Sequence, residues 1–185
     1  MSNTKTAAGR LNTVDIVYIA IGAALIAVCS WINIPTTVPF TLQTFAVFLT
    51  LLLLGGERGT LATVVYVIMG AIGLPVFSGF KGGAGALLGN TGGYILGFIF
   101  MSIVYALIVR FVSDTLLTRI ISLMLGLVVC YAFGTGWFMF VYMKNTGPVG
   151  VMTVLGWCVI PFIIPDILKL AAAILISKRV KPFIR

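Results

Sequence analysis

Long apolar runs separated by short polar or glycine-rich connectors dominate the chain. Crossing a bilayer takes about 20 mostly apolar residues, and the pattern predicts six such helices. They cover residues 15–34, 41–55, 60–76, 92–110, 119–142 and 150–177. The second is short, and the sixth is long enough to tilt or to begin with an interfacial turn. We therefore expect an all-α integral membrane domain over 15–177, between a polar segment at 1–14 and a basic tail at 178–185.

The composition indicates the same class of protein. Of 185 residues, 61% are hydrophobic and 9% are charged, and the mean hydropathy is +1.19. Soluble domains are about half apolar and a quarter charged, so a soluble globule could not cover this much apolar surface. The sequence excludes a disordered chain, a disulfide-stapled secreted domain and an ordinary cytosolic enzyme. Its three cysteines lie in apolar runs without a CxxC spacing, which favours buried thiols over a metal site or a disulfide.

The basic residues gather on alternate connectors. The chain has 12 Lys and Arg against 4 Asp and Glu. With the N-terminus in the cytoplasm, only Lys81 and Lys144 fall on outer connectors. The inner positions are Lys5, Arg10, Arg58, Arg110, Arg119, Lys178, Arg179, Lys181 and Arg185. The positive-inside rule then predicts six transmembrane helices with both termini cytoplasmic. No basic patch carries interleaved aromatics, so we expect these charges to meet the lipid bilayer and no nucleic acid.

Asp166 and Lys169 stand well inside the last apolar run. Each charge near the centre of a spanning helix costs about 2.5–3.5 kcal/mol on insertion scales. Their spacing of three places both on one helix face, and Pro161 and Pro165 loosen the helix beside them. Two interpretations remain: a ligand site, which we favour, or an internal salt bridge that ties the bundle together.

Two polar connectors are further candidates. The stretch 77–93 is rich in glycine and fits either a lid over a small-molecule site or an ordinary connector. It matches neither a Walker A nor a GxGxxG pattern. Thr41, Gln43 and Thr44 begin the second apolar run, where they either line a cavity or cap the helix at the interface.

Small and aromatic residues also form patterns. Ala20 and Ala24, and likewise Ala23 and Ala27, form small-xxx-small frames in the first apolar run. Such a face lets another helix approach closely, and the pattern alone favours a neighbour in the same chain over another subunit. The aromatics of 131–142 are typical of an interfacial belt, with a minority that could wall a pocket.

Several motifs, taken together, resemble one known family. They are VPFTLQTF at 38–45, GAIGLPVFSG at 70–79, the pair Gly82 and Gly83, LGNTGGY at 88–94 and IPDILK at 164–169. They look like the BioY family, the biotin-specific substrate-binding (S) components of energy-coupling factor (ECF) transporters. The resemblance runs in order from about residue 12 to 175.

The resemblance implies a six-helix protein of the prokaryotic cell membrane with both termini inside. Such S components bind their vitamin from outside and dock on a transmembrane T component and a pair of cytosolic ATPases. ATP hydrolysis then belongs to the partner subunits, and no cofactor is expected here beyond biotin as the ligand.

The resemblance also assigns residues. Asp166 and Lys169 match the family's Asp-x-x-Lys ligand pair, and the segment from Gly79 to Tyr94 matches its ligand-covering loop. The substrate-binding residues expected on this basis are Asp166, Lys169, Gln43, Phe80, Lys81, Gly82, Gly83, Asn90 and Tyr94. The small face is similar to the AxxxA surface that meets the T component, which makes Ala20, Ala23, Ala24 and Ala27 the expected partner-binding residues.

Two positions depart from the family. Relatives carry Pro where Asn90 stands, and position 81 varies, so Lys81 either pairs with the biotin carboxylate or is a solvated loop lysine. Two other functions stay open: an S component for another vitamin, or a small membrane enzyme that uses Asp166 and Lys169 as acid and base. The absence of histidine and of an acidic cluster disfavours the enzyme.

Overall fold

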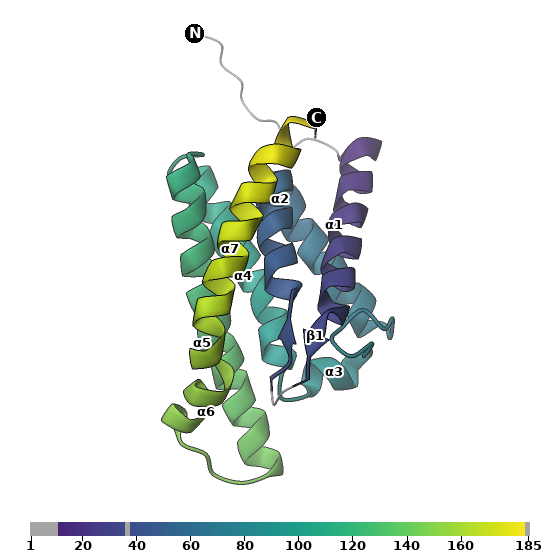
Figure 1. The fold of residues 1–185 in the computed structure, drawn as a ribbon. Helices are drawn as coiled ribbons and strands as arrows, with labels where there is room; N and C mark the ends of the chain where they lie inside the picture. Colours follow the sequence, from purple (N-terminus) through teal and green to yellow (C-terminus); the bar gives the residue numbers. More distant parts are fainter. Residues whose placement is uncertain (1–10, 36–37, 184–185) are drawn as a thin grey trace.

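The structure, a computed structural model, describes residues 11–35 and 38–183. It is a bundle of long helices that run nearly side by side (Figure 1). The long helices are α1 (Thr13–Trp31), α2 (Gln43–Ala71), α4 (Gly92–Phe111), α5 (Leu116–Asn145) and α7 (Ile160–Val180). The shorter elements are β1 (Asn33–Ile34), β2 (Phe40–Thr41), α3 (Ala84–Leu88), α6 (Val151–Cys158) and the 3-10 turn η1 (Lys181–Phe183).

The structure confirms the prediction of a mostly helical chain whose long helices are apolar enough to cross a membrane. Among the described residues, five helical stretches are long and apolar enough to cross a membrane: α1, α2, α4, α5 and the stretch Val151–Phe183, which holds α6 and α7. The predicted runs 92–110 and 119–142 correspond closely to α4 and α5.

α2 folds back on itself at Gly55. This residue has φ 79° and ψ −178°, a conformation open almost only to glycine. Gln43 Nε2 donates to Tyr66 Oη at 2.8 Å although the two residues are 23 positions apart. A Cβ on Gly59 would lie 3.0 Å from Leu51 Cα. The segments 43–54 and 56–71 are therefore antiparallel, which accounts for the two predicted runs 41–55 and 60–76.

The last predicted run, 150–177, is two helices and not one. α6 and α7 meet at Val159, whose φ of −125° and ψ of −57° are not helical. Pro161 stands in the first turn of α7. Proline lacks an N–H and disfavours helical backbone in the residue before it, so it starts a helix more readily than it continues one.

The connector between α1 and α2 and the connector between α2 and α4 contain secondary structure that the sequence pattern did not predict. β1 and β2 pair antiparallel, with Asn33 opposite Thr41 and Ile34 opposite Phe40. The glycine-rich stretch contains α3, and Trp137 Nε1 donates to the Gly89 carbonyl at 3.0 Å, which anchors the segment to α5. Figure 1 shows the hairpin and α3 close together at one end of the bundle.

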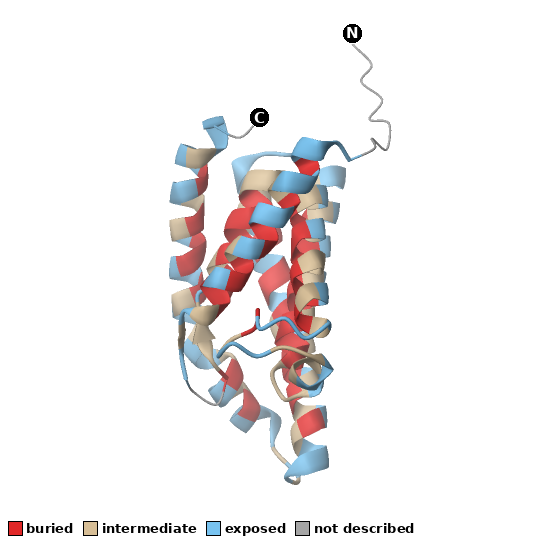
Figure 2. Cartoon of the chain, turned by 90° about the vertical axis from the view of Figure 1, so that its right-hand side faces the viewer, coloured by how far each residue is buried: buried red, intermediate tan, exposed pale blue. Residues whose placement is uncertain are grey.

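Buried residues line the inner faces of the helices, and exposed apolar residues line the outer faces (Figure 2). Glycine allows α4 and α5 to pack closely. A Cβ on Gly97 would lie 2.8 Å from Cys130 Sγ, and one on Gly126 would lie 2.8 Å from Met101 Cγ. The exposed apolar faces suit a lipid environment.

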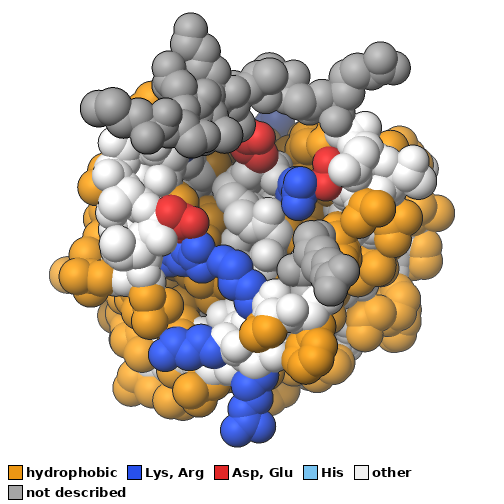
Figure 3. Space-filling model, turned by 90° about the horizontal axis from the view of Figure 1, so that it is seen from above, with side chains coloured by type: hydrophobic (Ala, Val, Ile, Leu, Met, Phe, Trp, Pro, Cys, Tyr) orange, Lys and Arg blue, Asp and Glu red, His pale blue; other side chains and the backbone are white. Residues whose placement is uncertain are grey.

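Ion pairs mark the end of the bundle that carries the start of α1 and the end of α7. Asp15 pairs with Arg58 at 2.7 Å, Glu57 with Arg110 at 3.5 Å, and Asp114 with Arg119 at 2.6 Å. Figure 3 shows basic and acidic side chains on this end face, with hydrophobic side chains around its rim. The hydrogen bonds from the Arg119 guanidinium lower the pKa of the Asp114 carboxyl. The predicted inner residues Lys5, Arg10 and Arg185 lie outside the described part of the chain.

Candidate ligand-binding site

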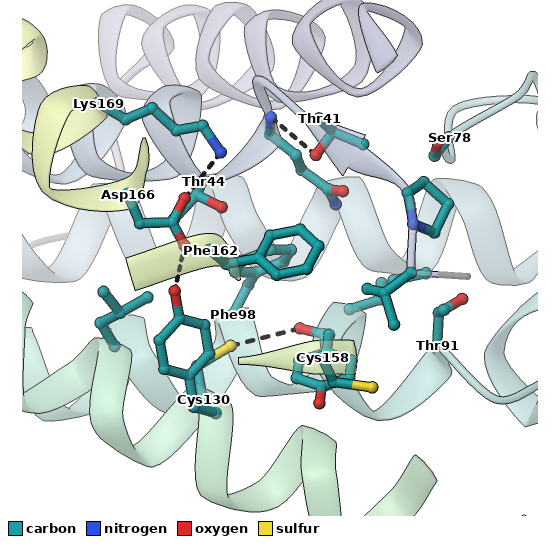
Figure 4. A pocket seen from close by; sticks show the side chains of 17 residues that line it. Thr41, Thr44, Ser78, Thr91, Phe98, Cys130, Cys158, Phe162, Asp166 and Lys169 are labelled. Atoms are coloured by element: carbon teal, nitrogen blue, oxygen red, sulfur yellow. Dashed lines mark hydrogen bonds and ion pairs between the residues drawn. The ribbon is translucent and has the colours of Figure 1, made fainter. Parts of the chain in front are cut away.

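A cavity lies near the opposite end of the bundle, where β2, α2, α4, α5, α6 and α7 converge (Figure 4). Its lining combines hydroxyl, amide, charged and apolar side chains. The lining residues are Val38, Pro39, Thr41, Gln43, Thr44, Ser78, Thr91, Tyr94, Ile95, Phe98, Leu127, Cys130, Tyr131, Cys158, Phe162, Asp166 and Lys169.

A buried ion pair forms one side of this cavity. Lys169 Nζ lies 2.7 Å from Asp166 Oδ1, and the two residues are 7% and 2% exposed. Tyr131 Oη donates to Asp166 Oδ2 at 2.5 Å. Both carboxylate oxygens are thus engaged, as a buried charge requires. The predicted pairing of Asp166 and Lys169 on one helix face is present.

An aromatic ring lies beside the ammonium group of Lys169, and a second ring stacks on the first. Lys169 Nζ stands 4.7 Å from the centroid of the Phe40 ring, within the range of a cation–π contact. Phe40 stacks on Phe162 with centroids 5.1 Å apart. The β hairpin therefore helps to position the ammonium group at the cavity wall.

The opposite side of the cavity is polar but uncharged. Figure 4 places Ser78 and Thr91 across the cavity from Asp166 and Lys169. Ser78 Oγ is buried and has no hydrogen-bond partner among the described residues. Ile95, Phe98 and Leu127 add apolar wall to the cavity. The site therefore offers charged and uncharged hydrogen-bonding groups on opposite sides, together with apolar surface.

Four of the predicted substrate-binding residues line this cavity: Asp166, Lys169, Gln43 and Tyr94. Gln43 is held by Tyr66, and Tyr94 Oη lies 3.0 Å from Thr135 Oγ1.

The other five predicted residues, Phe80, Lys81, Gly82, Gly83 and Asn90, are not among the lining residues of this cavity. Phe80 stacks on Trp31 with centroids 5.1 Å apart, and Gly83 N donates to the Gly70 carbonyl at 2.7 Å. The middle of the glycine-rich segment is thus tied to the ends of α1 and α2, while Ser78 and Thr91 near its two ends reach the cavity.

Sequence reasoning did not select Tyr131, Phe162, Cys130 and Cys158 as site residues. Tyr131 belongs to the aromatic cluster expected to form an interfacial belt with a minority walling a pocket, and its bond to Asp166 crosses 35 positions of chain. No local spacing carries that information. All three cysteines are buried, as expected, and two of them line the cavity.

The predicted partner-binding face is divided by the fold. Ala20 and Ala24 are exposed, whereas Ala23 and Ala27 are 1% and 4% exposed and belong to the core. Of the two frames, only Ala20 and Ala24 lie on the surface of the chain.

Comparison with known proteins agrees with this architecture. The BioY family profile matches residues 2–185. The "Biotin transporter BioY" of Thermotoga maritima is 42% identical over 159 residues, which are 85% of this chain and 90% of that protein. The "Probable biotin transporter BioY" of Pyrococcus horikoshii is 37% identical over 169 residues, or 90% of this chain and 96% of that protein.

A solved structure shares the fold. The crystal structure of the S-component for biotin from an ECF-type ABC transporter superposes with a TM-score of 0.80 at 25% identity. The superposition covers 98% of this chain and 95% of that chain.

The fold and its buried charged cavity define a multi-pass membrane protein of the S-component class. The chain belongs to the BioY family. The relatives named here are transporters rather than enzymes, so the enzyme interpretation is set aside.

Proposed function

We propose that this chain is the biotin-binding S component of an ECF transporter and mediates biotin uptake. The observation that carries the proposal is the buried group of Tyr131, Asp166 and Lys169 at one side of a cavity whose other walls carry apolar and uncharged polar side chains. The names of its relatives support biotin as the ligand.

The cavity chemistry suits the two ends of biotin. The ureido ring offers N–H donors and a carbonyl acceptor, which Asp166 and Lys169 would complement. Ile95, Phe98 and Leu127 would pack on the sulfur-containing ring and the alkyl chain. Ser78 Oγ, buried without a partner among the described residues, would hydrogen-bond to the polar tail.

The remaining predicted substrate-binding residues complete this proposal. Gln43 and Tyr94 would add polar contacts from the cavity wall. The residues Phe80, Lys81, Gly82, Gly83 and Asn90 would belong to the segment that covers the bound ligand.

In the membrane, we place the ion-paired end of the bundle in the cytoplasm and the cavity towards the outside. The six crossings of this arrangement are α1, 43–54, 56–71, α4, α5 and the stretch Val151–Phe183. Its support is that Arg58, Arg110 and Arg119 belong to the ion pairs of one end. Lys178 and Arg179 stand in the last turn of α7, which finishes at that end, and Lys144 stands in the last turn of α5, which finishes at the other (Figure 1).

Cysteine labelling tests this topology. In intact cells, a membrane-impermeant maleimide should label Lys144→Cys but not Lys178→Cys. The native thiols are buried and give a low background. The reverse labelling would overturn the orientation.

The proposal includes partners. A transmembrane T component and a pair of ATPases would energise uptake, and ATP would be hydrolysed by those partners. Ala20 and Ala24, the exposed frame of α1, would meet the T component. Co-purification of tagged protein with the T component should fall for Ala24→Leu and stay unchanged for Ala172→Leu, which lies on α7.

Calorimetric titration of biotin into the detergent-purified protein tests the ligand and the site together. Tight one-to-one binding is expected, and it should collapse in Asp166→Asn but persist in Asp114→Asn, which removes an exposed ion pair far from the cavity. Tight binding in all three proteins would show that biotin binds at a site that does not include Asp166. If titration of biotin into folded wild-type protein produced no heat of binding, biotin would be excluded as the ligand, and other vitamins would be tested.

A further inference from the structure

A second, apolar crevice opens on the outer surface of the bundle between α5, α6 and α7. Its volume is about 460 Å³. Residues of α5 such as Val128 and Ala132 form one wall, and Leu155, Ile163 and Ile167 belong to the other. Within the described residues the backbone of α7 packs along α2 and comes close to that of α5 at few points, so helix packing does not close the crevice.

This crevice lies inside the stretches that are apolar enough to cross the membrane. Val128, Ile163 and Ile167 are 60%, 42% and 46% exposed, which makes the crevice continuous with the lipid-facing surface of the protein. Whatever fills it therefore comes from the hydrocarbon layer or from another membrane segment.

Water is a poor occupant. The polar side chains of the lining are Tyr131 and Thr135. Tyr131 Oη is bonded to Asp166, and Thr135 Oγ1 is bonded to Tyr94. A buried water needs two to four polar partners, and both hydroxyls are already engaged. Apolar cavities in proteins stay dry or take up apolar molecules.

Two of the described residues, Leu127 and Tyr131, line both the crevice and the ligand cavity. These two side chains therefore belong to the wall between the crevice and the ligand cavity. We propose that an acyl chain of a membrane lipid occupies the crevice and packs against Leu127 and Tyr131, so that lipid supports the ligand cavity wall from its outer side.

Photo-cross-linking tests this site in the full-length protein without biotin, so its failure leaves the proposed function untouched. The protein is placed in phosphatidylcholine nanodiscs that contain a phosphatidylcholine with a diazirine midway along one acyl chain. Adducts are mapped by peptide mass spectrometry after irradiation. We expect a several-fold higher yield on Val128 and Leu155 than on Leu107, an exposed residue of α4 outside the crevice.

Two matched variants make the test specific. Ala132→Phe places a ring in the crevice from an exposed small residue, and Val129→Phe places the same ring on the exposed surface of the same helix. The Leu155 adducts should be lost in the first variant and retained in the second. Equal yields on Leu155 and Leu107, insensitivity to Ala132→Phe, or protein–protein cross-links in place of lipid adducts would each overturn the proposal.

Discussion

The phenol of Tyr131 donates a hydrogen bond to Asp166 Oδ2 while Lys169 holds Oδ1 of the same carboxylate. The first contact joins α5 to α7 and the second stays within α7. Asp166 is therefore fixed from two directions, and its orientation depends on a helix that is distant in sequence. A ligand that approaches this carboxylate meets a group whose position is set before binding.

Tyr131→Phe should weaken biotin binding by about tenfold. The variant keeps the ring that walls the cavity but leaves Asp166 with one hydrogen bond fewer, and a bond to a charged group contributes about 1.5–3 kcal/mol. The measurement is calorimetric titration. Tyr142→Phe, on the same helix but outside the cavity lining, should bind like the wild type, and equal affinity in both variants would contradict the role of Tyr131.

Ser78→Ala should weaken biotin more than it weakens biotin methyl ester. Ser78 Oγ is buried, lacks a partner among the described residues and lies across the cavity from Asp166. Loss of one hydrogen bond predicts an affinity change of about two- to tenfold. Titrations of the two ligands against wild type and variant measure the difference. Equal weakening of both ligands would show that Ser78 does not hydrogen-bond to the carboxylate of biotin.

Phe40→Leu should lower biotin affinity by about three- to tenfold, through a displaced Lys169. The variant removes a cation–π contact, which contributes about 0.5–2 kcal/mol, and the stack on Phe162. Phe40 is absent from the cavity lining, so the effect would be one of positioning. Phe100→Leu, which removes the ring that packs on Phe133, is the control and should leave binding unchanged.

Gly55→Ala should lower thermal stability without changing biotin affinity. The φ of 79° and ψ of −178° cost a residue with a Cβ about 1–3 kcal/mol, and the added Cβ meets no atom within 4 Å. The cost is therefore that of the turn itself. Gly136→Ala, a helical position with the same open surroundings, should be neutral or slightly stabilising. Thermal melts of the two variants separate the predictions.

Asp114→Asn should reduce stability slightly at neutral pH and not at all in strong acid. Arg119 lowers the pKa of the Asp114 carboxyl, so the ion pair stabilises the fold above the unfolded-state pKa of about 3.9 and loses its effect as pH falls through the folded-state pKa. The Asp114 side chain is 60% exposed, which limits the effect to about 1 kcal/mol or less. Melting curves at neutral and acidic pH should converge, and a difference that persists in acid would contradict the prediction.

Much of the helix layout followed from local sequence. Apolar runs of sufficient length predicted α1, α4 and α5 because lipid requires each spanning segment to satisfy its own backbone. The break at 55–59 was visible because glycine there interrupts an apolar run, and the structure places the reversal at Gly55. The division of 150–177 at Val159 was not predicted, since a proline in an apolar run is equally compatible with a kink.

The residues of the candidate site also fall into those that the sequence indicated and those that only the structure revealed. The sequence alone identified Asp166 and Lys169, because charges three residues apart in an apolar helix are costly and share one face. The family resemblance added Gln43 and Tyr94 to the expected residues. Only the tertiary structure decided that Tyr131 donates a hydrogen bond to the Asp166 carboxylate and that the Phe40 ring lies beside the Lys169 ammonium group. It also decided which alanines of α1 are buried, Ala23 and Ala27, and which are exposed, Ala20 and Ala24. Those facts depend on how each helix is rotated against its neighbours, and in a chain apolar on nearly every face the hydrophobic pattern does not specify that rotation.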